Sequence, residues 1–528
     1  MKDFHDTIEQ ILSLGPARRG QLSEQYLRGH RKDGTEVLHG PYYVLQWYEG
    51  RKKMSARIPK GQVERVRREL ERGRQVEALL GEAEEALWKR LSGPAQKKNG
   101  GEEDFGAELR ALDAAGFLGE DGFDLKGFEA AVRDAVRRTG LRYLSAFLNG
   151  TLPAMLGLER VRGGRGKRPR QIVTSLGETT LRRTYVPGRP CPLDEALGLV
   201  DGFTPEAASM LCVAGAMNES YDKGEGMLLK LSGLSVPGRS IQRLVNLVSP
   251  QMEAARADRA QPGFPEGTVV ENTQMDMTGV PMRPEDLVGA RGVDGDPRKR
   301  QIKAAVSFRQ VRGSAGDLQV EKSSVAHMVA FEDPERFGDR LYEWHRTRGP
   351  GRDVTHVVTS DGAKWIWDLV DRVFPEAVQI VDFYHACEHL MELCRLLRPG
   401  GDGTEAKALF ETRRRMLKAH GAANLVRYFE THGAQCPAAA QIGEKLEYFR
   451  VNGRRMRYGE FRRKGYVIGS GAVEGTCRSV VNQRADLSGQ RWHPEGALNV
   501  LRIRGMIMDG IHEDYWKARG MVRRSSAA

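Results

Sequence analysis

The sequence is poor in cysteine and has no long hydrophobic run, and each absence excludes a class of protein. Six cysteines among 528 residues are too few and too scattered for a disulfide framework and suit a reducing compartment. No stretch approaches the ~18 uncharged apolar residues of a membrane-spanning helix. Residues 1–15 carry acids inside their only apolar stretch and lack the apolar core of a signal peptide. We therefore expect a cytoplasmic protein with no membrane partner.

Basic residues are in excess. The 82 Lys and Arg residues outnumber the 70 Asp and Glu residues, which gives a formal net charge of +12. A basic surface favours polyanions, because each phosphate that it neutralises releases counterions. With 40% hydrophobic and 29% charged residues, the chain has the composition of a folded soluble protein. Its length predicts several domains, and its charge favours nucleic acid as a partner.

Residues 1–92 have the features of one small basic domain. Two aromatic or β-branched runs meet at Glu49 and Gly50, which predicts a β-hairpin. Residues 61–91 place apolar side chains near helical spacing among Arg and Glu, which predicts a charged helix. Solvated charge is sufficient to explain this composition. The alternative is a contact with DNA or a partner through Arg51, Lys52, Lys53 and Arg57.

A polar, glycine-containing linker at 92–104 separates this domain from a helical region at 105–160. Residues 161–265 begin with a flexible basic segment and continue with two strands around Gly177. They end in three helices that resemble a helix-turn-helix, and the last of these opens with Ser235. Its apolar face is Ile241, Leu244, Val245 and Val248, so Arg239, Gln242, Arg243 and Asn246 face outward.

This pattern assigns Arg239 and Arg243 to DNA contacts, since the last helix of a helix-turn-helix lies in the major groove. The alternative is an ordinary three-helix core module. In the first helix of the three, Thr204 is the expected N-cap and Pro205 occupies the first turn.

Residues 266–390 predict an α/β core with a mixed sheet. Three strand-like runs follow one another from residue 268 to residue 331, and helices then alternate with strands up to residue 390. Residues 391–465 are helical and basic, and residues 466–515 contain the final helix of the core and the C-terminal helices. The fold class is thus α/β, with flanking helices and an all-α insertion.

Three acids stand out by their local context. Asp276 lies between apolar neighbours inside the first strand, and Asp361 ends a later strand, at the carboxyl edge where α/β sheets place ligands. Glu474 lies in the first turn of the final helix, at the border of a buried face formed by Val473, Cys477, Val480 and Leu487. Three carboxylates that meet there would bind hard divalent cations. The alternative for each acid is an N-cap or a surface charge.

Four segments together resemble a known family: MDMTGV, TSDGAKWIW, VDFYHACEHL and IGSGAVEG followed by CRSVVNQR and SGQRW. They are similar to bacterial insertion-sequence transposases of the Kra group, in the DDE superfamily with an RNase H-like core. The resemblance runs from about residue 125 to residue 510, and residues 1–92 resemble a small extra domain. It implies that Asp276, Asp361 and Glu474 are the catalytic triad. Asp382 and His385 are similar to the (C/D)xxH element of Mutator and hAT transposases. The resemblance implies that these two residues support the catalytic site.

The resemblance also implies a reaction and its partners. The triad would hold two Mg²⁺ ions, with Mn²⁺ as a substitute, for phosphoryl transfer on DNA. The partners would be double-stranded DNA, as terminal inverted repeats and target, and further copies of the chain in a homodimer or larger complex. The expected location is the nucleoid. The residues expected to contact DNA near the triad are Lys364, Arg478, Arg484, Arg491 and Trp492.

Alternatives stay open for several of these residues. Trp492 also fits ordinary core packing, and His385, Cys387, His389 and Cys394 could form a zinc site. Many relatives carry two cysteines near residue 195, whereas this chain has only Cys191 there, so a zinc ribbon is not expected. At the level of function, the alternatives are a catalytically silent DNA-binding regulator and a stand-alone RNase H-like nuclease.

Overall fold

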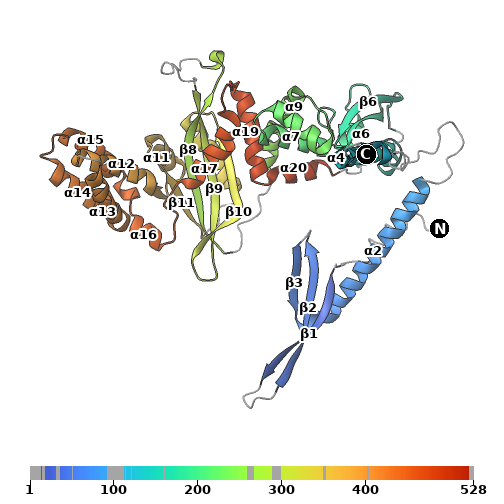
Figure 1. Cartoon of the computed structure of the whole chain (residues 1–528), viewed down its shortest axis with the longest axis horizontal. Helices are drawn as coiled ribbons and strands as arrows, with labels where there is room; N and C mark the ends of the chain where they lie inside the picture. Colours follow the sequence, from blue (N-terminus) through green and yellow to red (C-terminus); the bar gives the residue numbers. More distant parts are fainter. Residues whose placement is uncertain are drawn as a thin grey trace. The chain divides into compact units, whose positions relative to one another are not determined.

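A computed structural model of the chain describes residues 14, 18, 20–30, 36–49, 52–91, 112, 114–119, 122–158, 161–258, 267–287, 299–348, 353–400 and 403–521. The chain divides into two compact units, Met1–Asp104 and Phe105–Ala528 (Figure 1). The predicted linker at 92–104 lies outside the described residues, as do Gly50 and Arg51. Among the described helices, none has the length and hydropathy that a membrane crossing requires.

The first unit is an antiparallel sheet of three strands followed by a long helix. Its elements are β1 (Gln21–His30), β2 (Glu36–Glu49), β3 (Lys52–Ile58), the short 3-10 helix η1 (Lys60–Gln62) and α2 (Val63–Leu91). The predicted hairpin is confirmed, because Glu49 pairs with Lys52, and β1 is an additional strand on the other side of β2. The guanidinium of Arg57 lies 3.7 Å from the centre of the Tyr42 ring. A DNA contact by this unit stays a prediction.

The second unit begins with helices and a hairpin. In order along the chain they are η2 (Ala114–Phe117), β4 (Leu118–Gly119), β5 (Gly122–Phe123), α4 (Leu125–Ala146), a π-helical turn η3 (Phe147–Thr151), α5 (Leu152–Met155), β6 (Lys167–Thr174), β7 (Gly177–Thr184) and α6 (Pro192–Ala196). The predicted flexible basic segment is wrong for residues 167–171. They belong to β6, because their backbone pairs with residues 180–184 of β7.

Three helices follow as predicted: α7 (Pro205–Met217), α8 (Tyr221–Ser232) and α9 (Gly238–Asp258). The N-cap of α7 is Thr204, whose side chain accepts from the Ala207 amide. The last helix starts at Gly238 rather than at Ser235, because Pro237 disfavours helical geometry in the residue before it. The predicted apolar face is confirmed, since Ile241, Leu244, Val245 and Val248 are fully buried.

The centre of the unit is a mixed sheet of five strands in the order β10-β9-β8-β11-β12, which confirms the α/β prediction. β8 pairs antiparallel with β9 and parallel with β11. The strands are β8 (Thr268–Pro281), β9 (Lys299–Arg312), β10 (Leu318–Ala330), β11 (Thr355–Ser360) and β12 (Val378–Val381). The elements between them are η4 (Pro284–Asp286), α10 (Pro334–Thr347) and α11 (Lys364–Val373).

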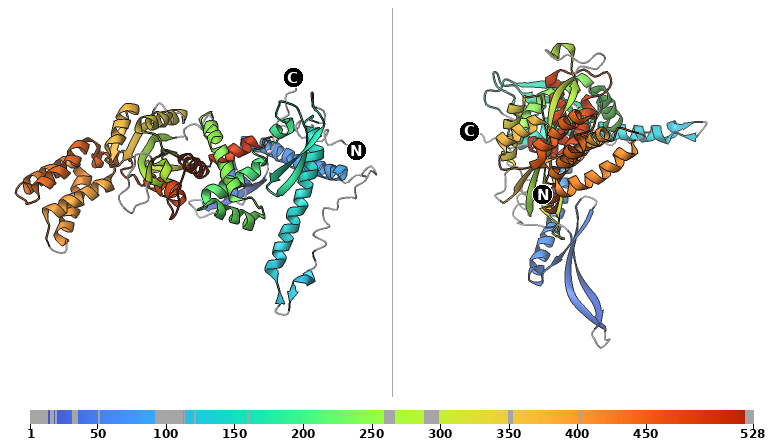
Figure 2. Two further views of the ribbon diagram at one scale, coloured as in Figure 1. Left: turned by 90° about the horizontal axis from the view of Figure 1, so that it is seen from above. Right: turned by 90° about the vertical axis from the view of Figure 1, so that its left-hand side faces the viewer.

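Figure 1 shows a group of helices on the side of the sheet where α11 lies, and the left view of Figure 2 shows the same group in orange. They are α12 (Phe383–Leu397), α13 (Thr404–His420), α14 (Ala422–Gly433), α15 (Ala439–Asn452), η5 (Gly453–Arg455) and α16 (Tyr458–Arg463), so the helical nature of 391–465 is confirmed. The predicted boundary at 390/391 falls inside α12. We refer to α12–α16 as the helical insertion.

The chain ends with helices that return to the sheet: α17 (Gly471–Thr476), a π-helical turn η6 (Cys477–Asn482), α18 (Gln483–Ala485), α19 (Pro494–Met508) and α20 (Ile511–Arg519). Leu487 lies beyond α18 and is half-buried, so it is not part of the helix face that we predicted.

The sheet separates two hydrophobic cores. Ala305 and Met275 pack with α10, α11 and the helical insertion, while Ala304 and Val306 pack with α7–α9, α17 and α19. Neighbouring residues of β9 therefore face different cores, as the alternation of a strand requires.

Candidate active site at the sheet edge

Asp276 lies on β8, and Asp361 directly follows the parallel neighbouring strand β11, which ends at Ser360. The pairing of these two strands extends as far as Thr273 of β8 and Val358 of β11, each three residues before one of the two acids. The Met275 amide donates to Ser360 Oγ at 3.0 Å, which holds the two strands together at this point. The first two acids of the predicted triad thus reach the same part of the sheet.

A buried glutamine places Glu474 next to these strands. Gln274 Nε2 donates to the Gly469 carbonyl at 2.9 Å, and its Oε1 accepts from the Val473 amide at 3.2 Å. Both bonds fix the turn that begins α17. Glu474 directly follows Val473, whose amide is bonded to Gln274 of β8, so Glu474 is held close to this strand. Gln274 is on the same face of β8 as Asp276, two residues away. Sequence reasoning missed Gln274, although a glutamine inside an apolar strand is a signal.

Asp382 fixes the other side of the same turn. It is buried and caps α12 by accepting from the His385 amide at 2.7 Å. Its Oδ2 accepts from the Ser470 amide and from the Ser470 hydroxyl, the latter at 2.6 Å. The same hydroxyl lies 3.2 Å from Glu474 Oε1. Asp382 is therefore placed to orient the Glu474 turn, in line with the supporting role that the resemblance implies.

His385 is half-buried on α12, beside side chains of the same helix and the Tyr448 ring of α15, whose centre lies 6.1 Å from that of the His385 ring. Its Nε2 lies 3.3 Å from Nε2 of His389, and its Nδ1 lies 3.4 Å from Glu388. Its supporting role therefore stays a prediction.

The three carboxylates share one electrostatic environment. The pKa of Asp276 is raised, first by burial and then by the charges of Asp361 and Glu474. Its Oδ1 accepts from the Met277 amide at 2.7 Å, and the Cys477 thiol lies 3.9 Å from Oδ2. The pKa of that thiol is raised to about 12 by burial and by Asp276, so it stays neutral at physiological pH. A cation bound at this edge would relieve the repulsion among the acids.

Asp276→Asn should raise the thermal stability of the metal-free chain at neutral pH. Because the folded state raises the pKa of Asp276 above its ordinary value of 3.8, ionisation of this group disfavours folding. This cost grows as the pH rises through the raised pKa and disappears below the ordinary value. We expect a higher Tm for the variant at pH 7 and a difference that shrinks towards pH 4, measured by thermal melting with EDTA. A variant that melts below the native protein at pH 7 would contradict this assignment.

The donor set fits a hard divalent cation in its chemistry. Asp276, Asp361 and Glu474 supply only carboxylate oxygens, which Mg²⁺ and Mn²⁺ prefer. Within the described residues, no group of three or more His, Cys, Asp or Glu side chains is close enough together to hold an ion. The residues of the alternative zinc site are therefore not grouped closely enough to hold an ion either, and its cysteines Cys387 and Cys394 are buried free thiols.

The expected DNA contacts near the triad divide into two groups. Lys364, Arg478 and Arg491 are exposed. Lys364 pairs with Asp368 at 2.6 Å, and Arg491 donates to the Gln490 carbonyl at 2.7 Å. The exposed Arg478 side chain forms no hydrogen bond or ion pair with the part of the chain that the structure describes. These three side chains are accessible to a polyanion.

Arg484 and Trp492 are buried, so the prediction that they contact DNA is wrong for this structure. Arg484 donates to the carbonyls of Gly215 and Glu219 at 3.0 and 3.2 Å, at the C-terminal end of α7. Its guanidinium lies 4.9 Å from the Trp492 ring centre. Trp492 Nε1 donates to the Ala485 carbonyl at 3.1 Å, and its backbone bridges to β8. The alternative of core packing for Trp492 is the one that the structure supports.

The outward face of α9 is only partly as predicted. Arg239 and Arg243 are exposed, and Arg243 Nε lies 2.7 Å from Asp201 Oδ2. Asn246 instead accepts from Asn499 of α19 at 3.3 Å, so it faces the interior. DNA binding through α9 stays a prediction.

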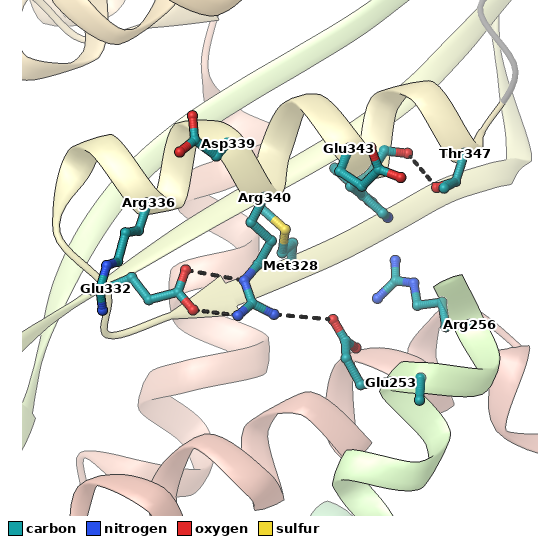
Figure 3. Close-up of a pocket in the computed structure, with 11 residues that line it drawn as sticks. Glu253, Arg256, Met328, Glu332, Arg336, Asp339, Arg340, Glu343 and Thr347 are labelled. Carbon is teal, nitrogen blue, oxygen red and sulfur yellow. Dashed lines mark hydrogen bonds and ion pairs between the residues drawn. The ribbon is translucent and has the colours of Figure 1, made fainter. Parts of the chain in front are cut away.

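A pocket of about 480 Å³ lies elsewhere, between α9, β10 and α10 (Figure 3). Arg340 lies between Glu332 and Glu253, with its Nε 3.0 Å from Glu332 Oε2 and its Nη1 3.9 Å from Glu253 Oε1. None of the predicted site residues lines this pocket.

Comparisons with known proteins give little more. No family model matches the chain, and no curated protein matches it either. Among solved structures, the chain is similar to the Drosophila P element transposase strand transfer complex, with 11% identity and a TM-score of 0.23. The match covers 62% of this chain and 83% of that chain. A TM-score this low does not establish a common fold.

Proposed function

We propose that the chain is a DDE transposase of an insertion sequence, of the Kra type with an RNase H-like core. The observation that carries this proposal is the placement of Asp276, Asp361 and Glu474 around one sheet edge, where both other acids raise the pKa of Asp276. The sequence motifs around the same three residues support it independently. The partners in this proposal are double-stranded DNA and a second copy of the chain, one for each end of the element.

Asp276 and Asp361 would hold two Mg²⁺ ions, and Glu474 would complete one of the two sites. The bound ions would supply activation of the attacking oxygen and stabilisation of the leaving oxygen. The chain itself orients the acids. Gln274 and Asp382 hold the turn that carries Glu474 from two sides, and the Ala363 amide donates to Asp361 Oδ1 at 3.0 Å. These bonds restrict the orientation of the acids, although within the described residues the three carboxylates are not close enough together to hold an ion.

DNA affinity should fall steeply with salt concentration. Lys364, Arg478 and Arg491 are exposed, and the chain carries a net charge of +12, so binding should release counterions. In titrations of a DNA duplex at 50–200 mM salt, we expect a linear fall of log K with log salt concentration. Arg478→Ala should lower the slope by about one unit, the loss of a single phosphate contact. A flat response of the native protein would contradict binding through phosphates.

A plasmid excision assay tests the proposed function. The gene with its native flanking DNA is placed between two halves of a reporter, with the protein supplied from a second plasmid. The proposal predicts excision and reinsertion that depend on Asp276, Asp361 and Glu474. Cleavage without joining would favour the nuclease. Binding without cleavage would favour the DNA-binding regulator.

A further inference from the structure

Tyr448 brings the helical insertion against the backbone next to Asp361. The ring of Tyr448, on α15, lies against Gly362, the residue that follows Asp361. A Cβ atom at position 362 would come within 2.1 Å of this ring and 3.0 Å of the Tyr448 hydroxyl oxygen. Only glycine allows this approach. The contact therefore brings a phenol hydroxyl to the backbone next to a predicted catalytic carboxylate.

The Tyr448 hydroxyl has no hydrogen-bond partner among the described residues, although its oxygen is buried from solvent. Burying a hydroxyl without a partner costs about 1–3 kcal/mol. Burial raises the pKa of Tyr448, and the charges of Asp361 and then Asp382 raise it further, so the phenol keeps its proton. The side chain is therefore a hydrogen-bond donor that faces negative charge.

Two contacts hold the ring in place from the side of α12. The His389 ring stacks on Tyr448 with 4.0 Å between the ring centres. Lys445, one turn earlier on α15, has its Nζ 2.6 Å from Glu392 Oε2 on α12. Because α12 is capped by Asp382, the ring and the Glu474 turn are anchored to the same helix.

We propose that Tyr448 is a positioning residue of the acidic edge, whose hydroxyl donates a hydrogen bond to the Asp361 carboxylate when the site carries its divalent metal. The helical insertion then contributes a side chain to the catalytic site. This inference rests on the proposed function, because it needs Asp361 to be a metal ligand. Loss of a hydrogen bond that orients a metal ligand typically lowers metal affinity by about 10- to 100-fold.

Tyr448→Phe removes the hydroxyl and keeps the ring against Gly362. We expect its affinity for Mn²⁺, measured by calorimetry on the full chain without DNA, to fall by about 10-fold or more. The melting temperature should not fall, since the lost hydroxyl has no partner in the metal-free structure. Tyr458→Phe is the matched control, because its hydroxyl is also buried and unpartnered within the described residues but its ring packs on Phe383. This control should bind Mn²⁺ like the native protein.

The possible results separate the two proposals. If the native protein binds Mn²⁺, Asp361→Asn loses this binding and Tyr448→Phe keeps it, the role of Tyr448 is overturned while the proposed function stands. If the native protein and Asp361→Asn bind Mn²⁺ equally, or neither binds it, the metal site itself is overturned and the role of Tyr448 with it. Equal losses in Tyr448→Phe and Tyr458→Phe would also overturn the specific role of Tyr448.

Discussion

Asp361→Asn should abolish DNA cleavage and leave DNA binding intact. The substitution keeps the size of the side chain and an acceptor for the Ala363 amide, but removes one of the negative charges that a divalent cation needs. Metal ions contribute several kcal/mol of transition-state stabilisation, so we expect the cleavage rate to fall about 1,000-fold or more. The measurement is cleavage of the element's end DNA in Mg²⁺, with binding to the same DNA measured in parallel.

Asp368→Asn is the matched control for this prediction. Asp368 lies two turns further along the chain on α11, is exposed and pairs with Lys364 at 2.6 Å. The same change of one charge there should leave cleavage within a few-fold of the native rate. If both variants cleave like the native protein, Asp361 is not part of the catalytic site. If Asp361→Asn also loses DNA binding, the effect is not specific to chemistry.

Arg484→Ala should destabilise the second unit by about 3–5 kcal/mol. The residue is 1% exposed, and its removal leaves a cavity between two rings and takes one donor each from the carbonyls of Gly215 and Glu219, of which Glu219 keeps its bond from Gln490 Nε2. The guanidinium lies 4.8 Å from the Tyr221 ring centre and 4.9 Å from that of Trp492. Urea denaturation followed by tryptophan fluorescence measures the change in the free energy of unfolding.

Arg478→Ala separates stability from DNA binding. Arg478 is exposed on the same helical segment, so its removal should change the free energy of unfolding by no more than about 0.5 kcal/mol. The expected pattern is a loss of stability for Arg484→Ala and a loss of DNA affinity for Arg478→Ala. If instead Arg484→Ala keeps its stability and binds DNA more weakly, the buried position of Arg484 is contradicted.

The strands of the sheet could be predicted because their pattern is local. Apolar runs of strand length, followed by alternating helices, were sufficient for β8 to β12 and for a mixed sheet. The position of Asp361 followed from the same runs, since an acid at the end of a parallel strand lies at the carboxyl edge. Asp276 instead lies inside β8, where its apolar neighbours distinguished it. The basic residues 167–171 of β6 were different. Their strand character depends on pairing with β7, and their lysine, arginines and proline conceal it.

The orientation of single side chains could not be predicted in the same way. Arg484 is one of several arginines near Glu474, and its partners Gly215 and Glu219 lie 269 and 265 residues earlier in the chain. Nothing in its local sequence distinguishes it from the exposed Arg478. Gln274 poses the same difficulty, because its role becomes visible only when the turn at 469–473 is placed beside β8.

The bond between Gln274 and the Val473 amide spans 199 residues, and this has a consequence during protein synthesis. A growing chain can pair β8 with β11 as soon as residue 360 has left the ribosome, which sets Asp276 beside Asp361. Glu474 takes its place only after the whole helical insertion has emerged and the turn at 469–473 has docked. A chain that terminates early within the insertion thus contains both aspartates without the glutamate. Under the proposed function, premature fragments of this kind lack the third metal ligand and should not cleave DNA.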